Sequence, residues 1–156
     1  MKYKIKPRSD RIGRRRLYEL ADLLERDAKN KKGVSFDMNH WGYTENPDNP
    51  ISCGTSACAM GLAALSGEFK KAGLTYEFSE LGELDFRFKG RFTNGVSAAR
   101  RLFKIPLQDA YCLFTGGVSY GTGAKAERHM ARALRAYADG KTVKNEDGKS
   151  VLFAKV

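Results

Sequence analysis

The chain has 156 residues, with 28 Lys and Arg against 18 Asp and Glu, and a formal net charge of +10. This length suits one domain, and a composition of 42% hydrophobic and 29% charged residues excludes wholesale disorder. There is no apolar run of the roughly 20 residues that span a bilayer, we expect no secretory signal, and three cysteines argue against a disulfide framework.

The first 16 residues carry most of the charge. They hold one acid and eight basic side chains: Lys2, Lys4, Lys6, Arg8, Arg11, Arg14, Arg15 and Arg16. Concentrated positive charge attracts polyanions, and a basic arm on a nearly neutral body is common in nucleic-acid-binding proteins. We predict such an arm over residues 1–16, with a short edge strand over residues 1–6. The alternative is a solvated leader that only aids solubility.

The first helix is predicted over residues 10–28, with Ser9 as its N-cap. Its buried stripe contains Leu17, Leu20, Ala21, Leu24 and Ala28. Residues 33–52 are rich in Gly, Pro and Asn, which predicts a long irregular loop. A second helix is predicted over residues 55–66, and its small side chains indicate that another element packs closely against it.

Two stretches of alternating apolar residues, separated by Gly82, predict a β-hairpin over residues 74–92. A helix pair is predicted over residues 95–105 and 106–115. The second of these has an apolar stripe formed by Leu107, Ala110, Tyr111 and Phe114. A last helix is predicted over residues 122–138, with an inward face that contains Ala126, Met130, Ala133, Leu134 and Tyr137.

These elements predict an α+β fold: a mainly helical single domain of about five helices with a small, mostly antiparallel sheet. The expected organisation is a basic arm over residues 1–16, a helical core over residues 17–140 with the hairpin at its centre, and a β-rich tail over residues 141–156. We expect the tail to pair with the N-terminal strand.

Cysteine chemistry is one candidate activity. Cys53 precedes the second predicted helix, and the N–H groups of a helix N-terminus favour a thiolate. Asp37, His40 and Cys53 could act as orienting group, base and nucleophile of a cysteine-dependent hydrolase or transferase, with His129 as a rival base. The alternative is structural, with Cys58 packed among small residues.

Metal binding has less support in the sequence. Cys53 and Cys58 are separated by four residues, and the paired short spacings of structural zinc sites do not occur. We therefore expect no metal and no cofactor.

A second basic surface is predicted on the last helix. Its basic residues share one helical face: Lys125, Arg128, Arg132 and Arg135. The glycine-rich loop before this helix lacks the Gly-Lys-Ser/Thr sequence of a Walker loop, so we interpret it as a flexible turn. The alternative for the basic residues is an ordinary solvated face.

The run Cys53-Gly54-Thr55-Ser56-Ala57-Cys58-Ala59-Met60-Gly61 resembles the C-G-T-x-A-C-x-x-G stretch of a family of small uncharacterised proteins of bacteria and their tailed phages. Phe36-Asp37-Met38 and residues 98–114 are similar to that family as well. The resemblance covers residues 17–139. The family has no established activity, so the resemblance implies only a bacterial or phage origin.

These patterns predict a non-enzymatic basic binding protein that contacts nucleic acid, or a nucleoprotein or protein partner, through the arm and the last helix. A phage version would be a virion component or an inhibitor of a host defence complex. We expect little sequence specificity, because no base-reading motif occurs. Two alternatives remain: the cysteine-dependent enzyme, and an assembly protein whose termini add strands to a neighbour. The expected location is the bacterial cytoplasm or a phage virion, without a membrane partner.

Overall fold

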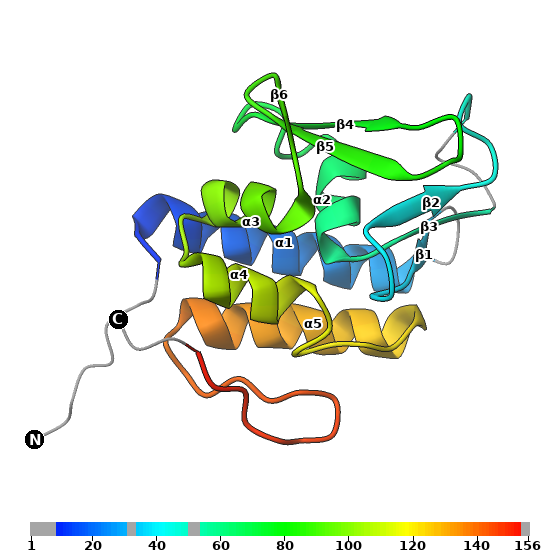
Figure 1. The fold of residues 1–156 in the computed structure, drawn as a ribbon. Helices are drawn as coiled ribbons and strands as arrows, with labels where there is room; N and C mark the ends of the chain where they lie inside the picture. Colours follow the sequence, from blue (N-terminus) through cyan, green and yellow to red (C-terminus); the bar gives the residue numbers. More distant parts are fainter. Residues whose placement is uncertain (1–8, 31–33, 50–53, 154–156) are drawn as a thin grey trace, which may run out of the picture.

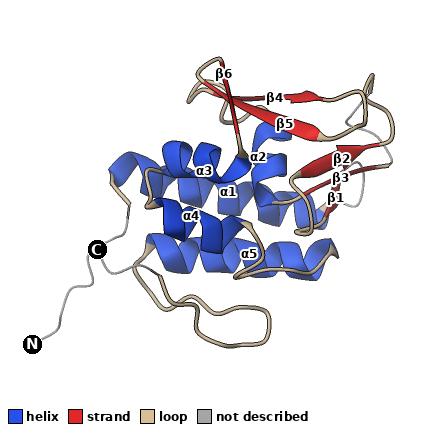
Figure 2. Ribbon diagram, viewed as in Figure 1, coloured by secondary structure: helices blue, strands red, loops and turns tan. Residues whose placement is uncertain are grey.

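The computed structural model of this chain describes residues 9–30, 34–49 and 54–153. These residues form five helices and two small three-stranded sheets, which confirms the predicted α+β fold. The helices pack together, and the sheet of the central hairpin covers one side of them (Figures 1 and 2). The predicted strand over residues 1–6 lies outside the described residues.

The two longest helices, α1 (Arg11–Lys29) and α5 (Gly123–Ala138), lie antiparallel and side by side (Figure 1). Every residue of the two predicted inward faces is buried. The N-cap of α1 is Asp10 and not Ser9, because the Asp10 carboxylate accepts a hydrogen bond of 2.8 Å from the backbone N–H of Gly13. Because α1 begins at Arg11, residues 11–16 of the predicted arm are helical.

Gly13 explains how closely α1 approaches α3 (Gly95–Phe103). A Cβ atom at Gly13 would lie 1.9 Å from the carbonyl oxygen of Phe103. Only glycine fits this contact, which places the first turns of α1 beside the C-terminal end of α3 (Figure 1).

The helix predicted over residues 55–66 is wrong in its first part. Residues Thr55–Ala57 form strand β3, and helix α2 (Ala59–Ser66) begins after the N-cap Cys58. The long loop predicted over residues 33–52 is also partly wrong, because it contains strands β1 (Ser35–Phe36) and β2 (Gly42–Thr44). β1 pairs with β3 in parallel and β2 pairs with β3 antiparallel. Strands this short carry no periodicity that the sequence could reveal.

The predicted hairpin is confirmed. Strands β4 (Leu74–Phe78) and β5 (Leu84–Phe88) pair antiparallel, and β6 (Arg91–Thr93) adds a third strand to β5. Helix α3 then leads into α4 (Leu107–Phe114), and the two form the predicted helix pair.

The buried face of α4 differs from the predicted stripe. Leu107 and Tyr111 are exposed, and Asp109 is buried together with the apolar Leu113. The carboxylate of Asp109 accepts a hydrogen bond of 2.5 Å from the hydroxyl of Tyr137 on α5. This buried polar pair turns the helix away from the orientation that its apolar residues alone favour.

The C-terminal tail forms no strand within its described part, residues 141–153. It turns back on itself instead: Lys144 bridges to Ser150, and the N–H of Val151 donates to the carbonyl of Val143 over 2.8 Å. The ring of Phe153 then packs on Tyr137 of α5 with 4.9 Å between ring centroids. The tail therefore covers α5, and its predicted β-rich character is not seen.

Candidate functional site

The predicted basic arm divides between described and undescribed residues. Lys2, Lys4, Lys6 and Arg8 lie outside the described residues. Of the remaining four, Arg11 and Arg15 are exposed on α1, and Arg15 lies 3.4 Å from Glu19.

Arg14 and Arg16 bind other elements of the fold. The guanidinium of Arg14 donates to Asp139 over 3.0 Å, just after α5. Arg16 donates to the backbone carbonyl of Leu102 in α3 over 2.8 Å. Both side chains therefore help to hold α1 against its neighbours.

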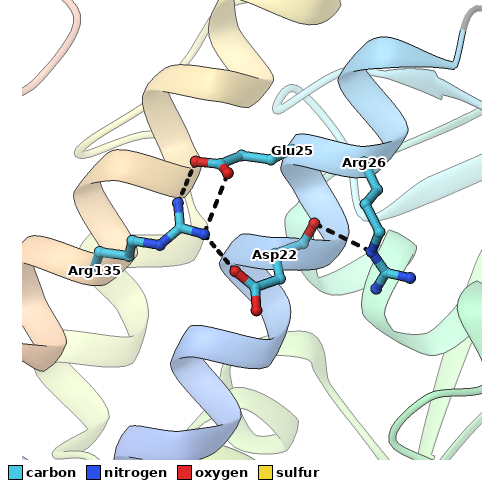
Figure 3. Close-up of polar contacts among 4 residues, drawn as sticks. All are labelled: Asp22, Glu25, Arg26 and Arg135. Carbon is cyan, nitrogen blue, oxygen red and sulfur yellow. Dashed lines mark hydrogen bonds and ion pairs between the residues drawn. The ribbon is translucent and has the colours of Figure 1, made fainter.

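The basic stripe predicted on α5 also divides. Lys125, Arg128 and Arg132 are exposed and have no ion-pair partner in the described part of the chain. Arg135 has a different role, because its guanidinium contacts the carboxylates of Asp22 and Glu25 on α1 (Figure 3). This charged contact fastens α5 to α1, so we leave Arg135 out of the candidate binding surface.

A further basic surface was missed by the sequence analysis. The first turns of α1, the C-terminal end of α3, the segment after α2 and the turn between β5 and β6 surround a groove of about 710 Å³. Its polar lining, which we call the basic groove, consists of Arg16, Lys71, Lys89, Arg100, Arg101 and Lys104. The other described lining residues are apolar or alanine, and none is acidic.

The charges of the basic groove are largely uncompensated. Five of its six basic side chains, all except Arg16, are exposed, and none of these five has an ion-pair partner among the residues described. Arg101 and Lys89 lie over the ring of Phe88, at 4.7 Å and 5.9 Å from its centroid. Cations grouped in this way raise the local positive potential, which favours a bound anion.

Two lysines of the groove have left-handed backbone conformations. Lys89, in the β5–β6 turn, has φ of 51°, and Lys104, the C-cap of α3, has φ of 52°. They are the only non-glycine residues with positive φ in the described part of the chain. Such positions usually hold Gly or Asn, since other side chains cost about 1 kcal/mol there. Strained residues concentrate at functional sites, so both lysines support a role for the groove.

The groove has little signature in the sequence. Its residues come from four separate segments, and only Arg100, Arg101 and Lys104 are close enough in the chain to show a local cluster. That cluster at the end of a predicted helix was the one available signal.

Part of the proposed catalytic set is brought together. The Nε2 atom of His40 lies 4.0 Å from Oδ2 of Asp37 and 2.8 Å from the hydroxyl of Ser56. A Ser-His-Asp relay needs the carboxylate on the other imidazole nitrogen, Nδ1. Because both partners contact Nε2, the geometry is that of a hydrogen-bonded cluster and not of a relay. Cys53, the predicted nucleophile, lies outside the described residues.

The two described cysteines are poor nucleophiles. Burial raises the pKa of the Cys58 thiol to about 12, and its sulfur accepts the N–H of Gly61 as the N-cap of α2. Burial and the nearby Asp109 also raise the pKa of Cys112. A thiolate is therefore disfavoured at both positions. The rival base His129 contacts the carbonyl of Lys144 at 3.0 Å, beside the C-terminal tail.

Within the described part of the chain, no three His, Cys, Asp or Glu side chains are grouped so that they could hold a metal ion. None of the described helices combines the length and the apolar character needed to cross a membrane. Comparison of the chain with models of protein families, with curated proteins and with solved structures finds no match.

Proposed function

We propose that this protein binds nucleic acid through the basic groove, by contacts to the sugar-phosphate backbone and without catalysis. The observation that carries the proposal is the groove lining of six basic and no acidic side chains among the described residues. Lysine and arginine that contact phosphates release condensed counterions, which drives binding of this kind.

The proposed binding has little dependence on base sequence. Phosphate contacts set position and affinity, whereas base-edge contacts set specificity. The exposed groove side chains are long cations from loops and helix ends, which suit contacts to phosphates. The nucleic acid would be met in a bacterial cytoplasm or a phage virion, where the sequence analysis expects this protein.

The test is fluorescence anisotropy with labelled oligonucleotides of single-stranded DNA, duplex DNA and RNA, each across a salt series. The groove variant combines Arg100→Gln, Arg101→Gln and Lys104→Gln, which removes three exposed charges from α3. A matched control combines Lys125→Gln, Arg128→Gln and Arg132→Gln, which removes the same charge from the exposed face of α5. A further variant replaces the four basic residues at positions 2, 4, 6 and 8 by Gln.

The groove variant should bind at least about tenfold more weakly, and the slope of log K against log salt should fall by about 3, because each phosphate contact contributes close to 1. The α5 control should change binding less than threefold. Equal losses in both variants would show that binding follows net charge and not the groove. Absence of binding at low salt would overturn the proposal, and a loss confined to the arm variant would move the site to residues 2–8.

A further inference from the structure

The opposite end of α1 borders a cavity of about 410 Å³ between this helix, the β1–β3 edge and the first turn of α5. Three carboxyl side chains line it: Asp27 from α1, Asp37 after β1, and Glu127 from α5. No Lys, Arg or His is among the described residues of its wall. An acidic wall is unexpected in a chain of net charge +10.

Glu127 is the central residue of this cavity. Its side chain is 1% exposed, and its Oε2 atom has no hydrogen-bond partner among the described residues. Buried glutamates are rare, because a carboxylate without donors loses its hydration and gains nothing in return. A buried acceptor that faces a cavity therefore indicates that a donor belongs there.

Asp27 and Glu127 interact across the cavity. Asp27 is near enough to act on the pKa of Glu127, and two facing carboxyls avoid mutual repulsion only if they share a proton. Burial raises the pKa of Glu127 to about 9 and raises that of Asp27 as well. The pair of carboxyls therefore holds a proton at neutral pH.

We infer that this acidic cavity binds a small organic cation that carries a guanidinium or primary ammonium group. Such a group brings several N–H donors to carboxylates, which can only accept, and it takes the position of the shared proton. The hydroxyl of Ser56 adds a polar contact, and Val34 and Phe36 provide an apolar wall for the carbon part of the ligand. A volume of about 410 Å³ suits a small molecule.

Two positive groups beside the cavity favour the ionised form of its carboxyls, which is the form that accepts from a cation. Gly123 and Ala124 place the N-terminus of α5 at the cavity, where its dipole stabilises ionised carboxylates. Arg128 lowers the pKa of Glu127 and acts in the same direction. Asp37 already accepts from Asn39 and lies near His40, so Asp27 and Glu127 offer the principal contacts.

Cation binding at this site should release a proton. Glu127 is mostly protonated below its pKa of about 9, so the cation must displace that proton, and affinity should rise between pH 6 and pH 8.5. Methylguanidinium is the suitable probe, since a guanidinium keeps its charge over this whole range. Methylurea has a similar shape without the charge.

The experiment is isothermal titration calorimetry of the full chain with methylguanidinium and methylurea, in two buffers of different ionisation enthalpy. The unchanged protein should bind methylguanidinium at least about tenfold more tightly than methylurea, with up to about one proton released at pH 7.5. Glu127→Gln should reduce the affinity at least about tenfold and abolish the proton release. The control Glu83→Gln, an exposed acid between β4 and β5, should leave both unchanged.

Equal affinity for the two probes, an undiminished affinity in Glu127→Gln, or no binding of methylguanidinium at pH 8.5 would each overturn the inference. Thermal unfolding checks that Glu127→Gln folds, and Asp27→Asn repeats the test from the other helix. The nucleic-acid affinity of Glu127→Gln should equal that of the unchanged protein, so this inference and the proposed function can fail separately.

Discussion

Helix α1 places two oppositely charged regions at its two ends. Arg16 lines the basic groove, and Asp27 lines the acidic cavity eleven residues further along, which is about 17 Å on an α-helix. The groove keeps five of its six charges exposed to water, whereas the cavity buries Glu127, which shares a proton with the half-buried Asp27. Exposed charge acts at a distance and is screened by salt, while buried charge acts only on a ligand that enters.

Ion pairs join α1 to α5 and to the residue that follows α5. Arg135 with Asp22 and Glu25 joins α5 to α1 between the groove and the cavity (Figure 3). Arg14 pairs with Asp139 near the start of α1. The basic residues with a carboxylate from another helix beside them therefore serve the fold, and the exposed unpaired ones are the candidates for ligand binding. The following predictions separate these roles.

The largest effect is expected from Glu127→Gln on the pH dependence of stability. The pKa of Glu127 rises from 4.5 to about 9 on folding, so the folded state holds a proton that the unfolded state releases. The free energy of unfolding should therefore decrease as the pH rises from 5 to 8, by at most about 1.4 kcal/mol per pH unit.

Urea unfolding across this pH range measures the effect. Glu127→Gln should remove most of the decrease, because glutamine does not titrate, and Glu83→Gln should retain it. The same pH dependence in Glu127→Gln and in the unchanged protein would contradict the buried carboxyl pair.

Charge reversal in the groove should have the next largest effect. Arg100→Glu with Arg101→Glu changes the local charge by four units without touching a paired residue, and we expect at least about a hundredfold loss of nucleic-acid affinity at low salt. Anisotropy measures the loss. Lys125→Glu with Arg128→Glu is the matched reversal on α5, and an equally large effect there would show that the groove has no special role.

Arg135→Met should lower stability and leave binding unchanged. The substitution keeps the aliphatic stem but leaves Asp22 and Glu25 facing each other without a cation. Because these acids are partly exposed, we expect a loss of about 1 kcal/mol in the free energy of unfolding. Denaturant unfolding and anisotropy on the same variant check the two halves of this prediction, and weaker oligonucleotide binding would place Arg135 in the binding surface after all.

The smallest effect is expected at the strained lysines. Glycine adopts the left-handed conformation at the end of α3 without the steric cost that a lysine bears. We therefore expect Lys104→Gly to raise the free energy of unfolding by about 0.5–1 kcal/mol. The same change removes one groove charge, so oligonucleotide affinity should fall a few-fold. The free energy of unfolding should thus rise while the oligonucleotide affinity falls. If both rose or both fell, the strained backbone of Lys104 would have no link to binding.

Local periodicity accounts for the elements that could be predicted. The faces of α1 and α5 and the β4–β5 hairpin follow from apolar spacing within a single segment. The β1–β3–β2 sheet could not be predicted, since its strands are two or three residues long and pair with partners distant in the chain. The orientation of α4 depends on the hydrogen bond between Asp109 and Tyr137, which are 28 residues apart.

The candidate sites follow the same division. The excess of basic residues was evident from composition, and it is the basis of the prediction of a polyanionic partner. The sequence did not show which basic residues are free of ion pairs. Arg132 and Arg135 belong to the same helical stripe, but only Arg135 lies beside the acids Asp22 and Glu25 of α1. Glu127 was missed because a glutamate in an amphipathic helix is normally exposed.

The sequence by itself determined the fold class, the three main amphipathic or alternating segments and the sign of the net charge. These depend on composition and on residues close together in the chain. Tertiary structure alone decided that four separate segments form the basic groove and that Asp27 meets Glu127. Both follow from the antiparallel packing of α1 on α5 and the close approach of Gly13 to α3, which bring side chains together at distances no local pattern encodes.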